Sequence, residues 1–220
     1  MSPRPFAVDP EVMAAIRPMG PADVQRVAEL HHAAMGNSLW ATLGLRFLRA
    51  VYTALLEDES FLGFVYDGGH IGGFIAGSQD TDAMLSRTFR RAWWSLGLAS
   101  LPASVRPTTL RKLLQTASYT DTSGGAHMAE SLFCSFEPEL RGKRISGHIN
   151  KVLFDELLAR GHQRVKVTTE VDNKGANRQL TSWGFEDAAR FDFYGKPMVR
   201  YELDLSASAR VQATRRHPAP

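Results

Sequence analysis

One stretch of the sequence decides the fold: Phe136-Glu137-Pro138-Glu139-Leu140-Arg141-Gly142-Lys143-Arg144-Ile145-Ser146-Gly147. The residues that lead into it, 131–136, form a mainly apolar run bounded by a proline, which predicts a strand. Residues 145–160 place apolar side chains at helical spacing and are followed by Gly161, which predicts a helix with a glycine just past its end. A short basic loop containing glycine therefore joins a strand to a helix N-terminus.

Such a loop is suited to bind a phosphate or pyrophosphate. The first backbone N–H groups of a helix have no partner within the helix, and the helix dipole adds partial positive charge there. The side chains of Arg141, Lys143 and Arg144 add further positive charge. On its own, however, a basic turn before a helix is more often a solvated loop, and this one lacks the lysine-hydroxyl ending of a Walker loop.

The flanking sequence predicts an α/β (α+β) domain. Before the deciding stretch, the patterns predict an edge strand at 16–19, helices at 21–36 and 39–56, and a hairpin with strands at 61–66 and 71–76. After it, they predict a strand at 164–170, a helix at 173–183, and closing strands at Phe185 and 198–205. We therefore expect a mixed central sheet of six to seven strands flanked by about four helices.

The domain boundaries follow from where these patterns begin and end. We expect one domain over residues 14–205, interrupted between the third and fourth strands by a helical insertion at 81–126, since a structureless loop of that length is uncommon. A helix in the insertion would carry Trp93 and Trp94 near basic residues; it could lie on a membrane or a partner, but we favour a wall of the acceptor site. Residues 1–13 show no convincing pattern, and we expect 206–220 to be a disordered tail.

Composition excludes some classes of function. The formal net charge is only +3, from 26 Lys and Arg against 23 Asp and Glu, so we infer no nucleic-acid partner. The single cysteine, Cys134, cannot form an intrachain disulfide, which favours the cytoplasm. No apolar stretch is long enough to span a bilayer, and the seven histidines are scattered without metal-ligand spacing, so we expect neither an integral membrane protein nor a metal site.

Two motifs in order resemble the GNAT superfamily of acyl-CoA-dependent N-acyltransferases. The family places Arg/Gln-x-x-Gly-x-Gly/Ala after a central strand, and Arg141 to Ser146 occupies that position. Its second signature, Asn-x-x-Ala ending in Gly-Phe, is similar to Asn173 to Ala176 followed by Gly184-Phe185. The resemblance covers about 16–205 apart from the insertion, and it implies an N-acetyltransferase that uses acetyl-CoA as cosubstrate and acts on the primary amine of a small molecule.

The resemblance also implies roles for particular residues. The coenzyme would be bound by backbone groups of Cys134 and Phe136, by the loop (Arg141, Gly142, Lys143, Arg144, Ile145, Ser146), and by Asn173 and Asn177. Glu130 would be the general base, with Glu170 as second candidate. Asn173 could equally cap its helix. We do not expect Cys134 to be a nucleophile, because free cysteines are usually small buried hydrophobes and no partner histidine pattern is apparent.

Two departures from the family pattern leave alternatives open. Arg144 and Ser146 stand where the family prefers glycine or alanine, although their backbone N–H groups remain. Leu180 stands where many members carry the tyrosine that protonates the leaving thiolate; Tyr194 is a candidate replacement, although a surface tyrosine is the simpler interpretation. A catalytically weak acyl-CoA-binding module with a regulatory role is therefore the alternative, a peptide or protein acceptor is a further option, and a homodimer is left open.

Overall fold

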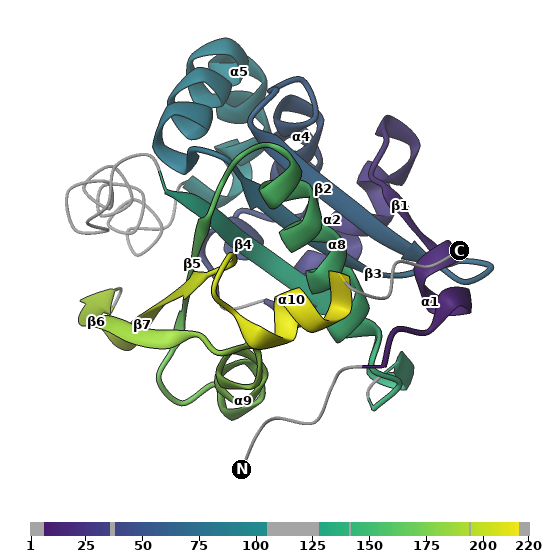
Figure 1. The fold of residues 1–220 in the computed structure, drawn as a ribbon. Helices are drawn as coiled ribbons and strands as arrows, with labels where there is room; N and C mark the ends of the chain where they lie inside the picture. Colours follow the sequence, from purple (N-terminus) through teal and green to yellow (C-terminus); the bar gives the residue numbers. More distant parts are fainter. Residues whose placement is uncertain (1–6, 36–37, 105–127, 141, 194, 216–220) are drawn as a thin grey trace.

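The structure, a computed structural model, describes residues 7–35, 38–104, 128–140, 142–193 and 195–215. Its centre is a seven-stranded sheet in the order β1-β2-β3-β4-β5-β7-β6 (Figure 1). The strands are β1 (Ile16–Pro18), β2 (Phe61–Asp67), β3 (Ile71–Ser78), β4 (Ala129–Phe136), β5 (Arg164–Glu170), β6 (Glu186–Phe193) and β7 (Lys196–Asp204). All neighbouring strands are antiparallel except β4 and β5, which are parallel. The expected mixed sheet is confirmed.

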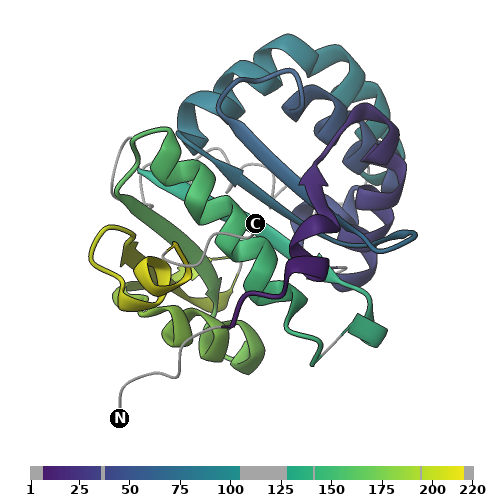
Figure 2. The same cartoon turned by 45° about the vertical axis from the view of Figure 1, so that its right-hand side comes forward.

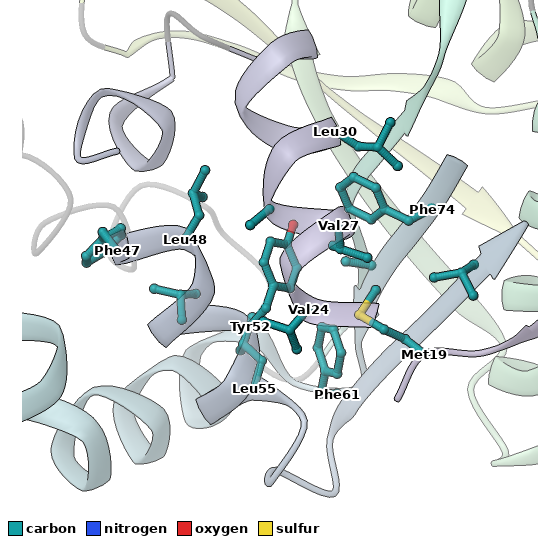
Figure 3. Close-up of a cluster of buried hydrophobic side chains, with 14 of the residues drawn as sticks. Met19, Val24, Val27, Leu30, Phe47, Leu48, Tyr52, Leu55, Phe61 and Phe74 are labelled. Atoms are coloured by element: carbon teal, nitrogen blue, oxygen red, sulfur yellow. The ribbon is translucent and has the colours of Figure 1, made fainter. Parts of the chain in front are cut away.

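One face of the sheet is covered by α2 (Val24–Ala34), α4 (Leu45–Leu55) and α5 (Thr81–Ser104), as Figure 1 shows. Their apolar stripes and the inward side chains of β2 and β3 form the first core (Figure 3). Tyr52 and Phe74 lie fully buried at its centre, edge to face with ring centroids 5.8 Å apart. This core holds the end of α2 firmly against β4, which fixes one wall of the site described below.

The opposite face is covered by α8 (Ile145–Ala159), α9 (Lys174–Trp183) and α10 (Ala209–Arg215). Leu153, Phe154 and Leu157 of α8 are fully buried against β2, β3 and β5. Phe154 packs edge to face on Trp183 of α9, with ring centroids 5.2 Å apart. Helix α8 begins at the end of the first family signature and helix α9 lies within the second, and both belong to this one core.

The N-terminal third differs from the expectation in two places. The helix expected at 39–56 is two helices, α3 (Leu39–Thr42) and α4, because Gly44 adopts a φ of +90° that ends one and begins the other. Residues before the expected domain start also have structure: α1 (Pro10–Ala14) is capped by the Asp9 carboxylate and is followed directly by β1. A short 3-10 turn, η1 (Pro21–Asp23), precedes α2.

The insertion and the tail also differ in part. The first part of the expected insertion is the single helix α5, whereas its remaining residues, 105–126, lie outside the described residues. The expectation of a disordered tail is wrong for the part described, since α10 buries Val211 in the second core to 1% exposure. The sequence indicated a closing strand only at Phe185, whereas the strand β6 covers Glu186–Phe193. Among all the described residues, no helix is both long enough and apolar enough to cross a membrane.

Candidate functional site

The site begins where β4 and β5 separate. These two parallel strands pair only at Ala129 with Val165 and at Glu130 with Lys166, and beyond those residues they diverge. β4 keeps its pairing to β3 as far as Phe136, and β5 keeps its pairing to β7 as far as Glu170. The centre of the sheet therefore contains a fork, and among the described residues no strand pairs with its two inner sides. Backbone groups in a protein interior need a hydrogen-bonding partner, so those of the fork are available to one.

The fork opens into a cleft of about 690 Å³. Its walls are β4 and β5, and its rim includes Ala34 at the end of α2 and the following residues Met35 and Ser38. Its other sides are the start of α9 and the β7 residues Lys196 and Met198. The α2 and β7 residues carry no motif, so sequence reasoning did not single them out. They reach the fork only through the tertiary fold, by the packing of α2 on the sheet and the pairing of β7 with β5.

Backbone groups of β4 face the cleft at the two predicted positions. The N–H of Glu137 donates to the carbonyl of Gly72 near the start of β3, 2.8 Å away. Because alternate residues of a strand direct their N–H and C=O groups to opposite sides, those of Phe136 and Cys134 face away from β3 and toward β5. Both residues line the cleft. Burial raises the pKa of the Cys134 thiol to about 12, which favours the protonated thiol at neutral pH.

The predicted phosphate loop leads into α8 through η2 (Pro138–Leu140). Gly142 has φ +80° and Arg144, the residue before the helix, has φ +60°. Gly142, Lys143 and Arg144 are exposed, whereas the Ile145 side chain is buried and Ser146 half-buried. Within the part of the chain that the structure describes, no side chain caps the start of the helix, so its first N–H groups are open to a ligand. Arg141 lies outside the described residues.

The second signature supplies Asn173 and Ala176 to the lining of the cleft, and the residue after it, Asn177, holds the adjoining turn. Asn173 lines the cleft and caps α9, its Oδ1 accepting from the N–H of Ala176 at 3.1 Å. Asn177 instead donates to the carbonyl of Val171 at 2.9 Å, which holds the β5–α9 turn. Gln179 reaches the carbonyl of Ser146 at 3.4 Å, so the two signatures meet at the start of α8. Leu180 lines the cleft and is 7% exposed.

Glu130 lies at the base of the fork, beneath the cleft rather than in its lining. It is 4% exposed, and its Oε2 is 3.8 Å from Nζ of the equally buried Lys166. Burial raises the pKa of Glu130, against the opposing effect of Lys166. Among the described residues, Oε2 has no hydrogen-bond partner. The group is thus a carboxylate that binds a proton more readily than an exposed one.

The other acid and base candidates lie elsewhere. Glu170 lines the cleft at its open end and forms an ion pair with Lys196. Tyr194 lies outside the described residues, as do the side chains of Trp93 and Trp94. Within the ranges that are described, no group of histidine, cysteine or acidic side chains could hold a metal ion.

No protein-family model matches the sequence, and no curated protein matches it significantly. Solved structures do match. The structure named SsHAT has a TM-score of 0.65 at 18% identity over 86% of this chain and 97% of that one. A ribosomal-protein-alanine N-acetyltransferase from Brucella melitensis has a TM-score of 0.57 at 16% identity over 86% and 98%.

A third structure, from Desulfovibrio desulfuricans and assigned to the GNAT family of acetyltransferases, has a TM-score of 0.56 at 10% identity over 86% and 98% of the two chains. These identities are low, so the likeness concerns the path of the chain and not the chemistry. The order of the strands, the fork and the helix after the basic loop nevertheless agree with the family resemblance of the sequence. The chain has the fold of the GNAT acetyltransferases.

Proposed function

We propose that the protein is an acyl-CoA-dependent N-acyltransferase that moves an acetyl group from acetyl-CoA to the primary amine of a small-molecule acceptor. The observation that carries this proposal is the fork between β4 and β5, with an uncapped helix N-terminus and a basic loop beyond its open end. The fork offers backbone partners to an extended, amide-containing arm, and the helix offers N–H groups to phosphates.

Each part of the coenzyme has residues suited to it. The N–H and C=O groups of Cys134 and Phe136 would bind the pantetheine arm in the way a neighbouring strand would. The backbone of Gly142 to Ser146, with the charges of Lys143 and Arg144, would bind the pyrophosphate. The coenzyme supplies an activated acyl group as a thioester, so the protein has to provide orientation and proton transfer.

The amine nitrogen would attack the thioester carbonyl carbon, and the carbon–sulfur bond would break. An alkylamine is largely protonated at neutral pH, so a base must remove its proton. We assign that role to Glu130, whose burial favours proton uptake, with the proton passing through water because Glu130 does not line the cleft. The charged side chains of the cleft lining, Glu170 and Asp172 against Lys196, favour a cationic acceptor.

One observation favours the alternative of a catalytically weak acyl-CoA-binding module. Leu180 occupies the position where family members carry a proton-donating tyrosine, and it is packed into the second core. A thiol with a pKa near 8.5 is a tolerable leaving group without such an acid. Loss of the acid therefore costs less than loss of the base, and we keep the enzyme as the first proposal.

The test separates binding from turnover. Calorimetry with acetyl-CoA and CoA should give binding, and saturation at about one hundred times Kd should add about 2.7 kcal/mol to the free energy of unfolding. Release of the free thiol is then followed across a panel of alkylamines, amino acids and short peptides with a free N-terminus. Binding with turnover supports the enzyme, binding without turnover on any acceptor supports the alternative, and absence of binding at millimolar coenzyme contradicts both.

A further inference from the structure

His148 lies in the first turn of α8, outside both family signatures. Its side chain is buried, with the residue 1% exposed. Its Nε2 is 2.8 Å from the backbone nitrogen of Asp9, and its Nδ1 is 2.9 Å from the carbonyl oxygen of Arg144. The ring therefore joins the segment before α1, 139 residues from His148 in the sequence, to the loop proposed to bind the coenzyme phosphates.

The two contacts define the protonation of the ring. A backbone N–H can only donate, so Nε2 accepts from Asp9 and carries no proton. The ring is then neutral with its proton on Nδ1, and Nδ1–H donates to the carbonyl of Arg144. The structure thus assigns the tautomer from the chemistry of the partners alone.

Arg144 needs such a partner because of its backbone. Among the described residues it is the one non-glycine residue with positive φ, at φ 60° and ψ 8°. This left-handed conformation is unfavourable for a residue that has a Cβ atom. The Arg144 carbonyl also accepts from the backbone N–H of Gly147 at 3.0 Å and from that of His148 at 3.4 Å. The His148 ring adds a third donor to the same carbonyl, and this one comes from a side chain.

The orientation of that carbonyl determines where the next N–H points. The peptide group is planar and trans, so the N–H of Ile145 points opposite to the carbonyl of Arg144. With the carbonyl held along α8, the Ile145 N–H is directed out of the helix N-terminus. It is therefore aimed at the place where the proposed function puts the pyrophosphate.

We propose that His148 is a positioning residue for the coenzyme pyrophosphate: it holds Arg144 in its left-handed conformation and thereby aims the Ile145 N–H at the phosphate. The inference rests on the proposed function. The N-terminal segment takes part, because the N–H of Asp9 fixes the far side of the ring just before α1. Figure 2 shows α1 lying beside α8, and Figure 1 shows the same neighbours from another side.

Three substitutions separate the two bonds of the ring. His148→Asn places an amide N–H where Nδ1–H was, and so keeps the donor to Arg144 but not the acceptor for Asp9. His148→Gln places its amide oxygen near the position of Nε2, and so keeps the acceptor for Asp9 but not the donor to Arg144. His148→Ala removes both. His162→Ala, just past the other end of α8, is the matched control, since its ring Nε2 lies 3.3 Å from the side-chain oxygen of Gln79, far along the helix from Arg144.

The first readout is the Kd of CoA measured by calorimetry. We expect Kd to rise about tenfold in His148→Ala and His148→Gln, about threefold or less in His148→Asn, and not at all in His162→Ala. The second readout is kcat/KM with two donors. It should fall about tenfold for acetyl-CoA but stay within about twofold for S-acetylpantetheine, which lacks the pyrophosphate. A general loss of structure would lower both donors alike.

The third readout uses glycine at position 144, which adopts positive φ without strain. In an Arg144→Gly background, the further change His148→Ala should raise Kd by less than about threefold, because the conformation no longer needs an anchor. The positioning role would be overturned if His148→Ala raised Kd equally in both backgrounds, or if it lowered kcat/KM equally with both donors. Either result would leave the proposed function intact. Wild-type protein that binds no CoA would overturn both.

Discussion

At the scale of single residues, Glu130 is the group whose environment departs most from what its sequence context suggested. A glutamate at the start of a strand, next to an insertion, could have been a surface residue, but the folded sheet buries it beside Lys166. Glu130→Gln should lower turnover at pH 7 by at least about tenfold, because a general base contributes typically about 10²–10⁴-fold. Turnover should recover in part toward pH 10, where free amine is abundant.

Glu170→Gln is the matched control, since it removes a carboxylate that lines the cleft but is paired with Lys196. Steady-state kinetics of both variants from pH 6 to 10 decide between them. If Glu170→Gln is inactive while Glu130→Gln behaves as wild type, Glu170 is the base and Glu130 has a structural role.

The same substitution has a stability readout. Burial raises the pKa of Glu130 above its ordinary value of 4.5, so the folded state binds this proton more tightly than the unfolded state. The stability that this tighter proton binding contributes is complete below the pKa that Glu130 has in the unfolded state. It is lost as pH rises through the pKa that Glu130 has in the folded state. Relative to wild type, Glu130→Gln should therefore gain stability between pH 4 and pH 8 in urea denaturation. A difference independent of pH would contradict the raised pKa.

At the scale of elements, the two ends of α8 make a matched pair. Gly142 precedes the helix with φ +80° and Gly161 follows it with φ +88°, and an added Cβ would meet no heavy atom within 4 Å at either. Gly142→Asp places a negative charge against the proposed phosphate site and should weaken CoA binding at least about tenfold. Gly161→Asp imposes similar backbone strain at the far end and should leave Kd unchanged. If calorimetry gave the same Kd of CoA for Gly142→Asp and Gly161→Asp, this loop would not be the phosphate site.

The elements also show how far the sequence could be used for prediction. Residues 164–170 alternate clearly between apolar and polar positions, and β5 has those bounds. The two strands of the first hairpin and the start of α8 were likewise predicted, because local patterns specify them. The strand before β7 was predicted only at Phe185, because β6 carries the exposed acidic residues Glu186, Asp187 and Asp192, which resemble a loop when the pairing with β7 is not known.

The candidate site was likewise predicted in part from the sequence. Cys134, Phe136 and Asn173 were predicted to lie at the coenzyme site, and the structure brings all three to one cleft. The rim residues from α2 and β7 could not be predicted, because only tertiary register places them there. His148 escaped notice because its partners, the Asp9 N–H and the Arg144 carbonyl, are backbone groups that leave no trace in residue types.

At the scale of the whole molecule, the C-terminal segment belongs to the domain. Arg210 stacks over the Trp183 ring at 4.4 Å, and Ser208 donates to the carbonyl of Trp183 at 2.9 Å. Val211→Asp would bury a charge in the second core and should cost at least about 2 kcal/mol of unfolding free energy. Ala209→Asp, exposed at the start of the same helix, should change it by about 0.5 kcal/mol or less. Equal urea midpoints for the two variants would mean that α10 does not dock in solution.

The fork between β4 and β5 has a consequence for association with other chains. An ordinary open sheet exposes unpaired backbone groups only along its two outermost strands, which here are β1 and β6. Because β4 and β5 separate after two residue pairs, this sheet has a third such margin, in its middle. Unpaired strand margins are templates on which a foreign strand can add. The end of α2 and the start of α9 flank this one. We therefore expect it to admit a narrow arm but to hinder a second polypeptide strand, which carries side chains on both faces.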